Sequence, residues 1–513
     1  MTAKGAIAAG HPVTAQAAAD ILAAGGNAFD AVIAALWAAT VAEPVLASLG
    51  GGGFLMARPA GQPPRLYDFF AETPLAKKPA EVLEFSSCMA TFSGGVTQEF
   101  HGGYGAVATP GMVAGMFAIH RDLGRMPMFD LAQPAILAAR HGVTIDAFQA
   151  YVMTIIQPLL ALSDESRAAF GAPGKQDKDS FSTLAEGVLH QQPQLAETIT
   201  VLAQSGADGF YHGDIGKELV HACREQGGYL TADDLAAYRV LVRDPVLVAG
   251  RSGRFVLNAP PAAGGVLVGF GLKLAREMDI GDFGSLRHID RLSQILDATG
   301  IVRQQYGASP TILSDDVCES WRSLIGERPL SQDGTTHISV VDHDGNLAAA
   351  TVSNGSTSGR MIPGTGIMLN NMLGEQDLSP QGFHNWPCGV RMSSMMSPSL
   401  YLASDGRAVA LGSGGSNRIR STMLQVLLNL DVFGMSLEDA IAAPRIHAEG
   451  GILSIEPGFD QAILDRVTME NQQRWQETDM FFGGVHAAMV SDGRKSFGAA
   501  GDSRRNGCHM IVG

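Results

Sequence analysis

The segment that decides the fold is Asp333-Gly334-Thr335-Thr336-His337-Ile338-Ser339-Val340-Val341. From residue 336 onward, apolar and polar side chains alternate, as expected of a strand. Residues 342–346 have the composition of a tight turn, and residues 347–353 are typical of a returning strand. The sequence therefore predicts a β-hairpin that opens directly after a glycine and a threonine.

The bond between Gly334 and Thr335 is a candidate site of self-cleavage. The Thr335 hydroxyl can attack the Gly334 carbonyl, because glycine tolerates the distorted geometry of that step. Cleavage would leave an α-amine, with a usual pKa of about 7.7–8.0, beside the hydroxyl on one residue. That amine can serve as the general base for its own hydroxyl near neutral pH. Taken alone, however, Gly-Thr-Thr before a strand is more often an ordinary turn.

A second informative segment is Leu411-Gly412-Ser413-Gly414-Gly415-Ser416-Asn417-Arg418. It follows a predicted strand at residues 408–411 and precedes a predicted helix at residues 421–430. Glycines at such a turn expose backbone N–H groups that can stabilise an oxyanion. A phosphate site and a simple turn are the alternative interpretations.

A third segment, Ser393-Ser394 before Pro398, places two hydroxyls side by side. It predicts either a substrate carboxylate site or a loop with local capping bonds. Farther out, Thr14 is expected to cap a helix over residues 14–24, and Asn27 to cap a buried helix ending near Val41. The glycines at 50–53 lack a GxGxxG pattern, which favours a packing turn over a phosphate cradle.

The middle of the chain, residues 111–328, is expected to be mostly helical. The predicted helices include residues 134–141, 184–202, 232–238 and 286–305. The polar residues 167–182 predict a surface loop. After Asp333 the pattern changes to strands and turns, which makes this the best candidate for an internal boundary.

The composition limits the classes of function. Of the 513 residues, 46% are hydrophobic and 17% charged, so a large core is possible. The net charge of −15 argues against a nucleic-acid or anionic-membrane surface. We find no signal peptide and no apolar run near the roughly 20 residues of a membrane span, so we expect a cytoplasmic protein. The five cysteines are scattered and never in CxxC spacing, as expected for structural thiols.

Together the three segments resemble the gamma-glutamyltransferase family of N-terminal nucleophile hydrolases. The resemblance extends over nearly the whole chain. Further matching segments are residues 25–31, 110–115, 227–235, 258–265, 369–371 and 443–447. The resemblance implies an α+β fold, a four-layer αββα sandwich, formed as one compact unit from a precursor. Its heavy part would be residues 1–334 and its light part residues 335–513.

The resemblance also implies roles for individual residues. Thr335 resembles the nucleophile, and Gly414 and Gly415 resemble the oxyanion donors. Ser353 falls where the family has a threonine that hydrogen-bonds the nucleophile. Asn354 is a candidate for an asparagine expected just after it, although the loop length leaves that register open.

The glutamyl-binding residues of the family are only partly present. Ser393 and Ser394 resemble the pair that holds the substrate α-carboxylate. The family's Asp-Phe-Arg-Glu segment has Phe70 at the position of the arginine, which removes a charge-assisted contact. Met372 stands where the family has a glutamine that reads the α-ammonium. Glu375, which we take as the only nearby acid, could replace the family's aspartate.

The resulting hypothesis is a self-processing enzyme that cleaves a small-molecule amide through an acyl-Thr335 intermediate, passed to water or an amine. One alternative is an acylase or oxamate-type amidohydrolase that does not act on gamma-glutamyl compounds. Another is a non-catalytic binding relative, against which the intact Thr335, Gly414 and Gly415 argue. The absence of GxSxG and HExxH patterns argues against a serine hydrolase and a metalloenzyme, so we expect no metal and no cofactor. The oligomeric state stays open, with a dimer of processed pairs as one alternative.

Overall fold

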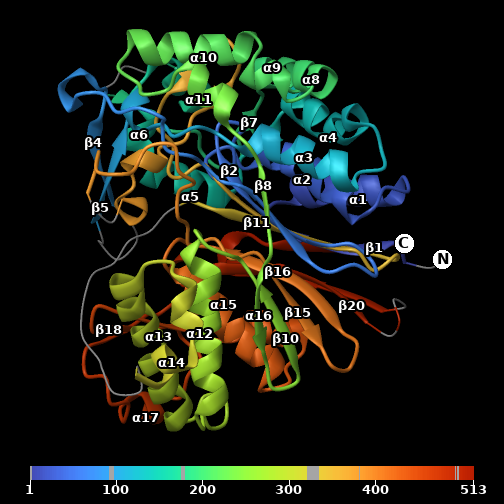
Figure 1. Cartoon of the computed structure of the whole chain (residues 1–513), viewed down its shortest axis with the longest axis vertical. Coiled ribbons are helices and arrows are strands. Elements are labelled where there is room, and N and C mark those ends of the chain that lie inside the picture. The colour runs from blue at the N-terminus through green and yellow to red at the C-terminus, as the bar shows by residue number, and fades with distance from the viewer. Residues whose placement is uncertain are drawn as a thin grey trace.

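Two β-sheets lie face to face, with helices covering the outer face of each (Figure 1). The computed structural model describes residues 3–91, 97–174, 180–320, 334–379, 382–491, 493 and 496–513. The order of layers is helix, sheet, sheet, helix, which is the four-layer arrangement expected from the sequence. Both ends of the chain lie on the same side of the molecule (Figure 1).

The upper sheet has seven strands and contains the predicted hairpin. Its order is β22 (Cys508–Val512), β1 (Gly5–Ala9), β11 (Thr336–Asp342), β12 (Leu347–Ser353), β2 (Gly52–Arg58), β3 (Arg65–Phe69) and β8 (Leu241–Arg243). The hairpin is antiparallel and places Thr336 opposite Val352. Strands from before and after residue 334 are interleaved, so the two halves of the sequence form one folding unit.

The lower sheet has six strands. Its order is β21 (Ser496–Ala500), β20 (Gly484–Ser491), β16 (Ala408–Gly414), β15 (Ser399–Ala403), β10 (Gly253–Leu257) and β9 (Val246–Ala249). Short accessory strands form four smaller sheets. They are β4 (Ser86–Thr91) with β5 (Thr97–Gly102), β6 (Val143–Thr144) with β7 (Leu189–His190), β13 (Met361–Ile362) with β14 (Ile367–Met368), and β17 (Ile446–Glu449) with β18 (Ile452–Ile455) and β19 (Gln472–Arg474).

The helices fall into two groups, one beyond each sheet (Figure 1). Above lie α1 (Pro12–Ala23), α2 (Ala28–Ala42), α3 (Met112–Leu123), α4 (Met128–His141), α5 (Ala147–Ile155), α6 (Gln157–Leu160), α7 (Asp164–Phe170), α8 (Pro193–Ser205), α9 (Asp208–Tyr211), α10 (Asp214–Glu225) and α11 (Ala232–Ala237). Below lie α12 (Ala263–Glu277), α13 (Leu286–Tyr306), α14 (Asp315–Ser320), α15 (Arg418–Asp431), α16 (Leu437–Ala442) and α17 (Gln461–Leu464).

The alternation along β11 decides which threonine faces the gap between the sheets. Ile338 and Val340 pack with the upper helices, whereas Val341 packs with the lower sheet. Successive side chains in a strand point to opposite faces. Thr335 is an even number of residues from Val341 and therefore falls on the side of the lower sheet. Thr336 is an even number of residues from Ile338 and falls on the side of the helices.

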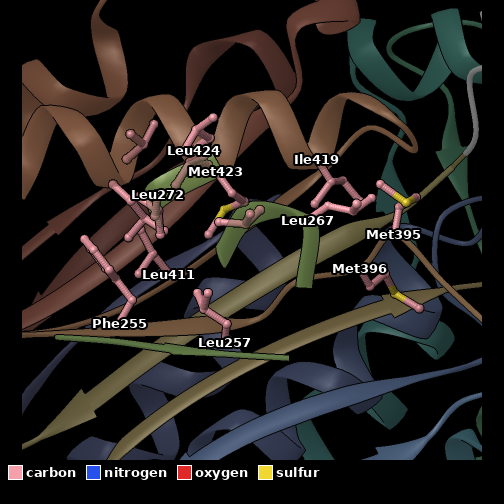
Figure 2. Close-up of a cluster of buried hydrophobic side chains, with 14 of the residues drawn as sticks. Phe255, Leu257, Leu267, Leu272, Met395, Met396, Leu411, Ile419, Met423 and Leu424 are labelled. Carbon is pink, nitrogen blue, oxygen red and sulfur yellow. The ribbon is translucent and has the colours of Figure 1, made fainter. Parts of the chain in front are cut away.

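The core beneath the lower sheet extends to the gap between the sheets. Leu267, Met423 and Leu424 pack there with Leu257 and Leu411 (Figure 2). Met395, Met396 and Ile419 continue the same cluster toward the start of α15 (Figure 2). Side chains fixed by this packing form a rigid floor for the region around Thr335.

Several sequence-based expectations for individual elements were wrong. Helix α1 is capped by His11, whose Nδ1 accepts from Val13 N at 3.1 Å, and not by Thr14. Residues 184–192 are not helical, because Pro193 begins α8. The first four residues of the expected surface loop, 167–170, are instead the end of α7, and residues 175–179 of that loop lie outside the described part of the chain. No helix in the described ranges is long and apolar enough to cross a membrane.

Candidate active site

Thr335 lies in the gap between the two sheets, against the end of β16. It is 5% exposed. A Cβ added to Gly414 would lie 2.2 Å from the Thr335 carbonyl oxygen, and one added to Gly412 would lie 2.4 Å from His337 Nδ1. Glycine is therefore required at both positions, because any side chain would push the two sheets apart.

Gly334 is held by Ser353, the last residue of β12. The Ser353 hydroxyl donates to the Gly334 carbonyl oxygen at 2.5 Å, and Gly355 N donates to the same hydroxyl at 3.0 Å. A Cβ on Gly334 would lie 2.8 Å from the Gly355 carbonyl oxygen. Close backbone contact thus gives a steric reason for glycine at position 334, in addition to the reactivity expected from the sequence.

The glycine turn after β16 has the strand-to-helix geometry predicted for it. Gly415 has φ 124° and Ser416 has φ 49°, both in the left-handed region. The helix α15 starts at Arg418, three residues earlier than expected. The turn places Gly414 against Thr335 and puts Gly415 in the lining of a cavity that also includes Gly334. Backbone close to the Gly334–Thr335 bond is what an oxyanion site would need.

A cavity opens beside Thr335, which we call the acyl-side cavity. Its apolar lining residues are Phe70, Met372, Leu378, Met395, Met396 and Ile419. Its polar lining residues are Thr335, Ser353, Glu375, Asp377, Ser394 and Ser416. Among the described residues that line it there is no lysine or arginine. The cavity therefore combines an apolar wall with two carboxylates.

Five of the predicted site residues line this cavity, namely Phe70, Thr335, Ser353, Glu375 and Ser394. The glycines at 334, 414 and 415 lie outside its lining, and so do Ser393 and Asn354. Ser394 lines it, whereas Ser393 is half-buried outside the lining. Asn354 is fully buried, and its amide nitrogen donates to the Leu369 carbonyl oxygen at 3.4 Å. Asn354 therefore supports a neighbouring loop and does not reach the cavity.

Asp377 is a site residue that the sequence interpretation missed. Its carboxylate accepts from Ser416 Oγ at 2.9 Å and from Asn417 Nδ2 at 3.4 Å. The prediction that Glu375 is the only nearby acid was wrong, because a short 3-10 turn over Gln376–Leu378 brings Asp377 to the cavity as well. The spacing of the two acids, two residues apart after Asn371, is a signal that could have found it.

Phe70, at the position where the sequence resemblance predicts an arginine, contributes an apolar ring to the cavity. It is 1% exposed and stacks on Phe54, with ring centroids 5.5 Å apart. Arg391 lies close by, and its guanidinium donates to the Phe70 carbonyl oxygen. However, Arg391 also pairs with Asp68 at 3.6 Å and with Glu72 at 3.5 Å. Its charge is thus engaged outside the cavity and does not replace the missing cation.

Thr336 points away from the cavity, to the buried Glu43 at the end of α2. Its hydroxyl donates to Glu43 Oε2 at 2.6 Å, and Thr14 Oγ1 donates to Oε1 at 2.7 Å. Burial raises the pKa of the Glu43 carboxyl to about 7. The two neighbouring threonines therefore have different surroundings, and only Thr335 lies beside the cavity.

Comparison with known proteins gives a consistent result over the whole chain. The gamma-glutamyltranspeptidase family model matches residues 14–512. The Acylase ACY 1 proenzyme of Pseudomonas sp. (strain SE83) is 31% identical over 486 residues, covering 90% of this chain and 85% of that protein. The glutathione hydrolase proenzyme of Escherichia coli (strain K12) is 27% identical over 540 residues, covering 97% and 90%. The crystal structure of cephalosporin acylase from Bacillus halodurans superposes with a TM-score of 0.83 at 23% identity, covering 99% of this chain and 96% of that one.

Proposed function

Because the chain belongs to the gamma-glutamyltranspeptidase family, we propose that it is a self-processing amidohydrolase with Thr335 as its nucleophile. The relatives named above are proenzymes, which supports division into a heavy part, residues 1–334, and a light part, residues 335–513. The observation that carries the proposal is the hydrogen bond from Ser353 to the Gly334 carbonyl oxygen beside the acyl-side cavity.

Self-cleavage follows from this arrangement in two steps. The Thr335 hydroxyl oxygen attacks the Gly334 carbonyl carbon, and the bond to the Thr335 nitrogen breaks as that nitrogen takes a proton. Water then hydrolyses the resulting ester, which leaves a carboxylate on Gly334 and a free α-amine on Thr335. The Ser353 hydroxyl stabilises the negative charge that builds on the Gly334 oxygen during the attack.

Amide cleavage then reuses the same atoms. The α-amine of Thr335 takes the proton of its own hydroxyl as the oxygen attacks the substrate carbonyl. Backbone N–H groups of Gly414 and Gly415 receive the developing oxyanion, and the α-amine returns the proton to the leaving amine. Water or a second amine finally removes the acyl group from Thr335.

The acyl-side cavity favours an acylase over an enzyme for gamma-glutamyl amides. A glutamyl group carries an α-carboxylate, which needs a charged or multiply hydrogen-bonded partner once it is buried. The described lining offers Ser394 but no cation, and the carboxylates of Glu375 and Asp377 repel the carboxylate of a glutamyl substrate. An uncharged or amine-bearing acyl group fits this lining better.

Fragment sequencing and one pair of variants test the proposal. The small fragment should begin Thr-Thr-His-Ile-Ser and contain 513 − 334 = 179 residues. Thr335→Ala should remain a single chain without amidase activity. The matched control Thr336→Ala should still be cleaved, because only its bond to Glu43 is lost. A different fragment start, or normal activity of Thr335→Ala, contradicts the proposal and favours a non-catalytic role or another nucleophile.

A further inference from the structure

A second cavity lies on the other side of the Gly334–Thr335 bond, and we call it the amine-side cavity. Gly334 and Gly415 form one wall. Apolar side chains, among them Val152, Ile156 and Phe481, form most of the rest. Two arginines, Arg418 and Arg505, complete the lining. Apolar surface with two guanidinium groups is the opposite of the acidic acyl-side cavity.

Arg505 is buried in a way that calls for an anionic partner. It is 6% exposed, and its Nη2 donates to the Met480 carbonyl oxygen at 3.2 Å. Its Nε and Nη1 have no hydrogen-bond partner in the described part of the chain. Burial, and then the charge of Arg418, lower the pKa of Arg505 to about 10, although the charges of Asp479 and Asp502 partly oppose this shift. A buried guanidinium with open donors is costly unless it binds a ligand.

The Arg505 guanidinium lies directly against the glycine turn. A Cβ added to Gly414 would lie 3.3 Å from Nη1, and a Cβ added to Gly415 would lie 3.3 Å from Nη2. The same Gly414 position touches the Thr335 carbonyl oxygen. Arg418 is held beside it, with Cζ 4.3 Å from the ring centroid of Phe481. The open donors of Arg505 are thus adjacent to the reacting residue.

The chemistry assigns the two sides of Thr335 to the two halves of an amide. The α-amine of Thr335 occupies the position of the nitrogen once bonded to Gly334. It must protonate the leaving amine, so that amine has to lie on the Gly334 side. The acyl group then takes the side lined by Glu375 and Ser394.

We propose that the amine-side cavity is a carboxylate-binding subsite in which Arg505 holds an acid carried by the leaving amine. The apolar body of that amine packs against Val152, Ile156 and Phe481. The substrate class is therefore an N-acyl amino acid with an apolar side chain, or a compound of the same shape. This inference rests on the proposed function.

The carboxylate left on Gly334 by self-cleavage has the same chemistry and begins in the same cavity. It could occupy Arg505 in the processed protein. In that case a carboxylate on the leaving amine would not increase kcat/KM. Loss of Arg505 would instead weaken the association of the heavy and light parts. The two sources therefore give different results in one set of variants.

The test compares N-butanoyl-L-phenylalanine with N-butanoyl-phenethylamine, which lacks only the carboxylate, on the processed protein. We expect kcat/KM to be about 10- to 100-fold higher for the acid. In Arg505→Met this ratio should fall to about 1. In Arg505→Lys, which keeps the positive charge but loses the paired N–H donors of the guanidinium, it should fall to an intermediate value. Arg121→Met, at an exposed arginine remote from Thr335, is the control and should keep the full ratio.

A binding measurement makes the test independent of the acyl group. L-Phenylalanine should raise the Tm of the processed protein more than phenethylamine does, and Arg505→Met or Arg505→Lys should reduce that difference. Equal kcat/KM values for the two amides, or equal Tm shifts if neither is cleaved, overturn the subsite. An unchanged ratio in Arg505→Met with easier separation of the two parts also overturns it, in favour of the Gly334 carboxylate. Failure of the chain to process at Thr335 would instead refute the proposed function.

Discussion

The Ser353 hydroxyl donates to the Gly334 carbonyl oxygen at 2.5 Å, from the last residue of the strand that returns from Thr336. Because β11 and β12 are neighbours in one hairpin, the bond is fixed by strand register and not by a flexible loop. In the proposed self-cleavage, the oxygen that receives this bond is the one that becomes negatively charged when Thr335 attacks. The hairpin would then hold both the attacking residue and the group that polarises its target.

Ser353→Ala should slow self-cleavage. Loss of a donor to a developing oxyanion usually lowers a reaction rate about 100- to 1,000-fold. We expect a smaller decrease in the self-cleavage rate, about 10- to 100-fold, because the Ser353 bond is already made to the uncharged carbonyl before the attack. The conversion of the full-length chain into two fragments on a gel gives the rate. Ser353→Thr keeps the hydroxyl and should process faster than Ser353→Ala. Ser404→Ala removes a hydroxyl at a surface turn and serves as the control; an equal rate in Ser353→Ala and the control would contradict the role of Ser353.

Gly414→Ala should prevent processing and lower stability. The added methyl group would lie 2.2 Å from the Thr335 carbonyl oxygen. Because both groups belong to the backbone framework of the two sheets, the end of β16 would have to move away from Thr335. We expect a loss of about 1–3 kcal/mol in the free energy of unfolding. Gly300→Ala in α13 meets its nearest atom, on Arg420, at 3.5 Å and should leave processing intact. Normal processing in Gly414→Ala would show that Thr335 does not need its close contact with β16.

Four p-nitroanilides of matched length should separate the contributions of the acyl group. They carry gamma-glutamyl, 4-aminobutanoyl, glutaryl and butanoyl groups, which have both charges, the ammonium, the carboxylate or neither. The α-carboxylate should cost about 1–3 kcal/mol, so the gamma-glutamyl amide should have a kcat/KM roughly 5- to 150-fold below the 4-aminobutanoyl amide. Glu375→Gln and Asp377→Asn should narrow that gap, whereas Glu438→Gln, at an exposed position of α16, should not. A preference for the gamma-glutamyl amide over the other three would mean that its carboxylate finds a partner we have not identified.

Glu43 should make the stability of the uncut chain depend on pH. Burial raises the pKa of Glu43 from 4.5 to about 7, so the folded chain is more stable when this carboxyl group is protonated and neutral. Stability from this group is fully present below pH 4.5 and is lost as the pH rises through 7. Between pH 5 and pH 8 the loss should be about 2–3 kcal/mol. Urea unfolding in a Thr335→Ala background should show this loss with Glu43 but not with Glu43→Gln, which keeps a neutral hydrogen-bonding group. The same pH dependence in both chains would assign it to other residues.

The parts of the fold that depend on local pattern could be predicted from the sequence. The hairpin at β11 and β12 follows from strand-forming residues on both sides of a turn, and the start of α2 follows from Asn27, which forms a capping box with Asp30. The same local reasoning missed the start of α1, because a histidine cap depends on which ring nitrogen faces the backbone. It also missed the short strands β8, β9 and β10. Of these, β8 pairs with the distant β3 and β10 with the distant β15, whereas β9 pairs with its sequence neighbour β10.

The candidate site shows the same division. Thr335, Gly414 and Ser353 belong to recognisable segments, so their meeting could be anticipated. Arg505 lies in a short turn near the end of the chain, and nothing next to it in sequence marks it. Arg505 contacts Gly414 and Met480, which are distant from it in sequence and come close to it only in the folded protein. The heavy and light boundaries and the cytoplasmic location stay predictions.

The interleaving of the upper sheet changes how the protein can recover from damage. Strand β1, from the first half of the sequence, hydrogen-bonds to β11 and β22, both from the second. Before cleavage, unfolding and refolding concern one molecule, and the partner strands remain tethered. After cleavage the same pairing must be rebuilt from two separate chains, at a rate that depends on their concentration. The chain therefore has one favourable opportunity to fold, before it is cut, and the lifetime of the mature protein is set by how slowly it unfolds.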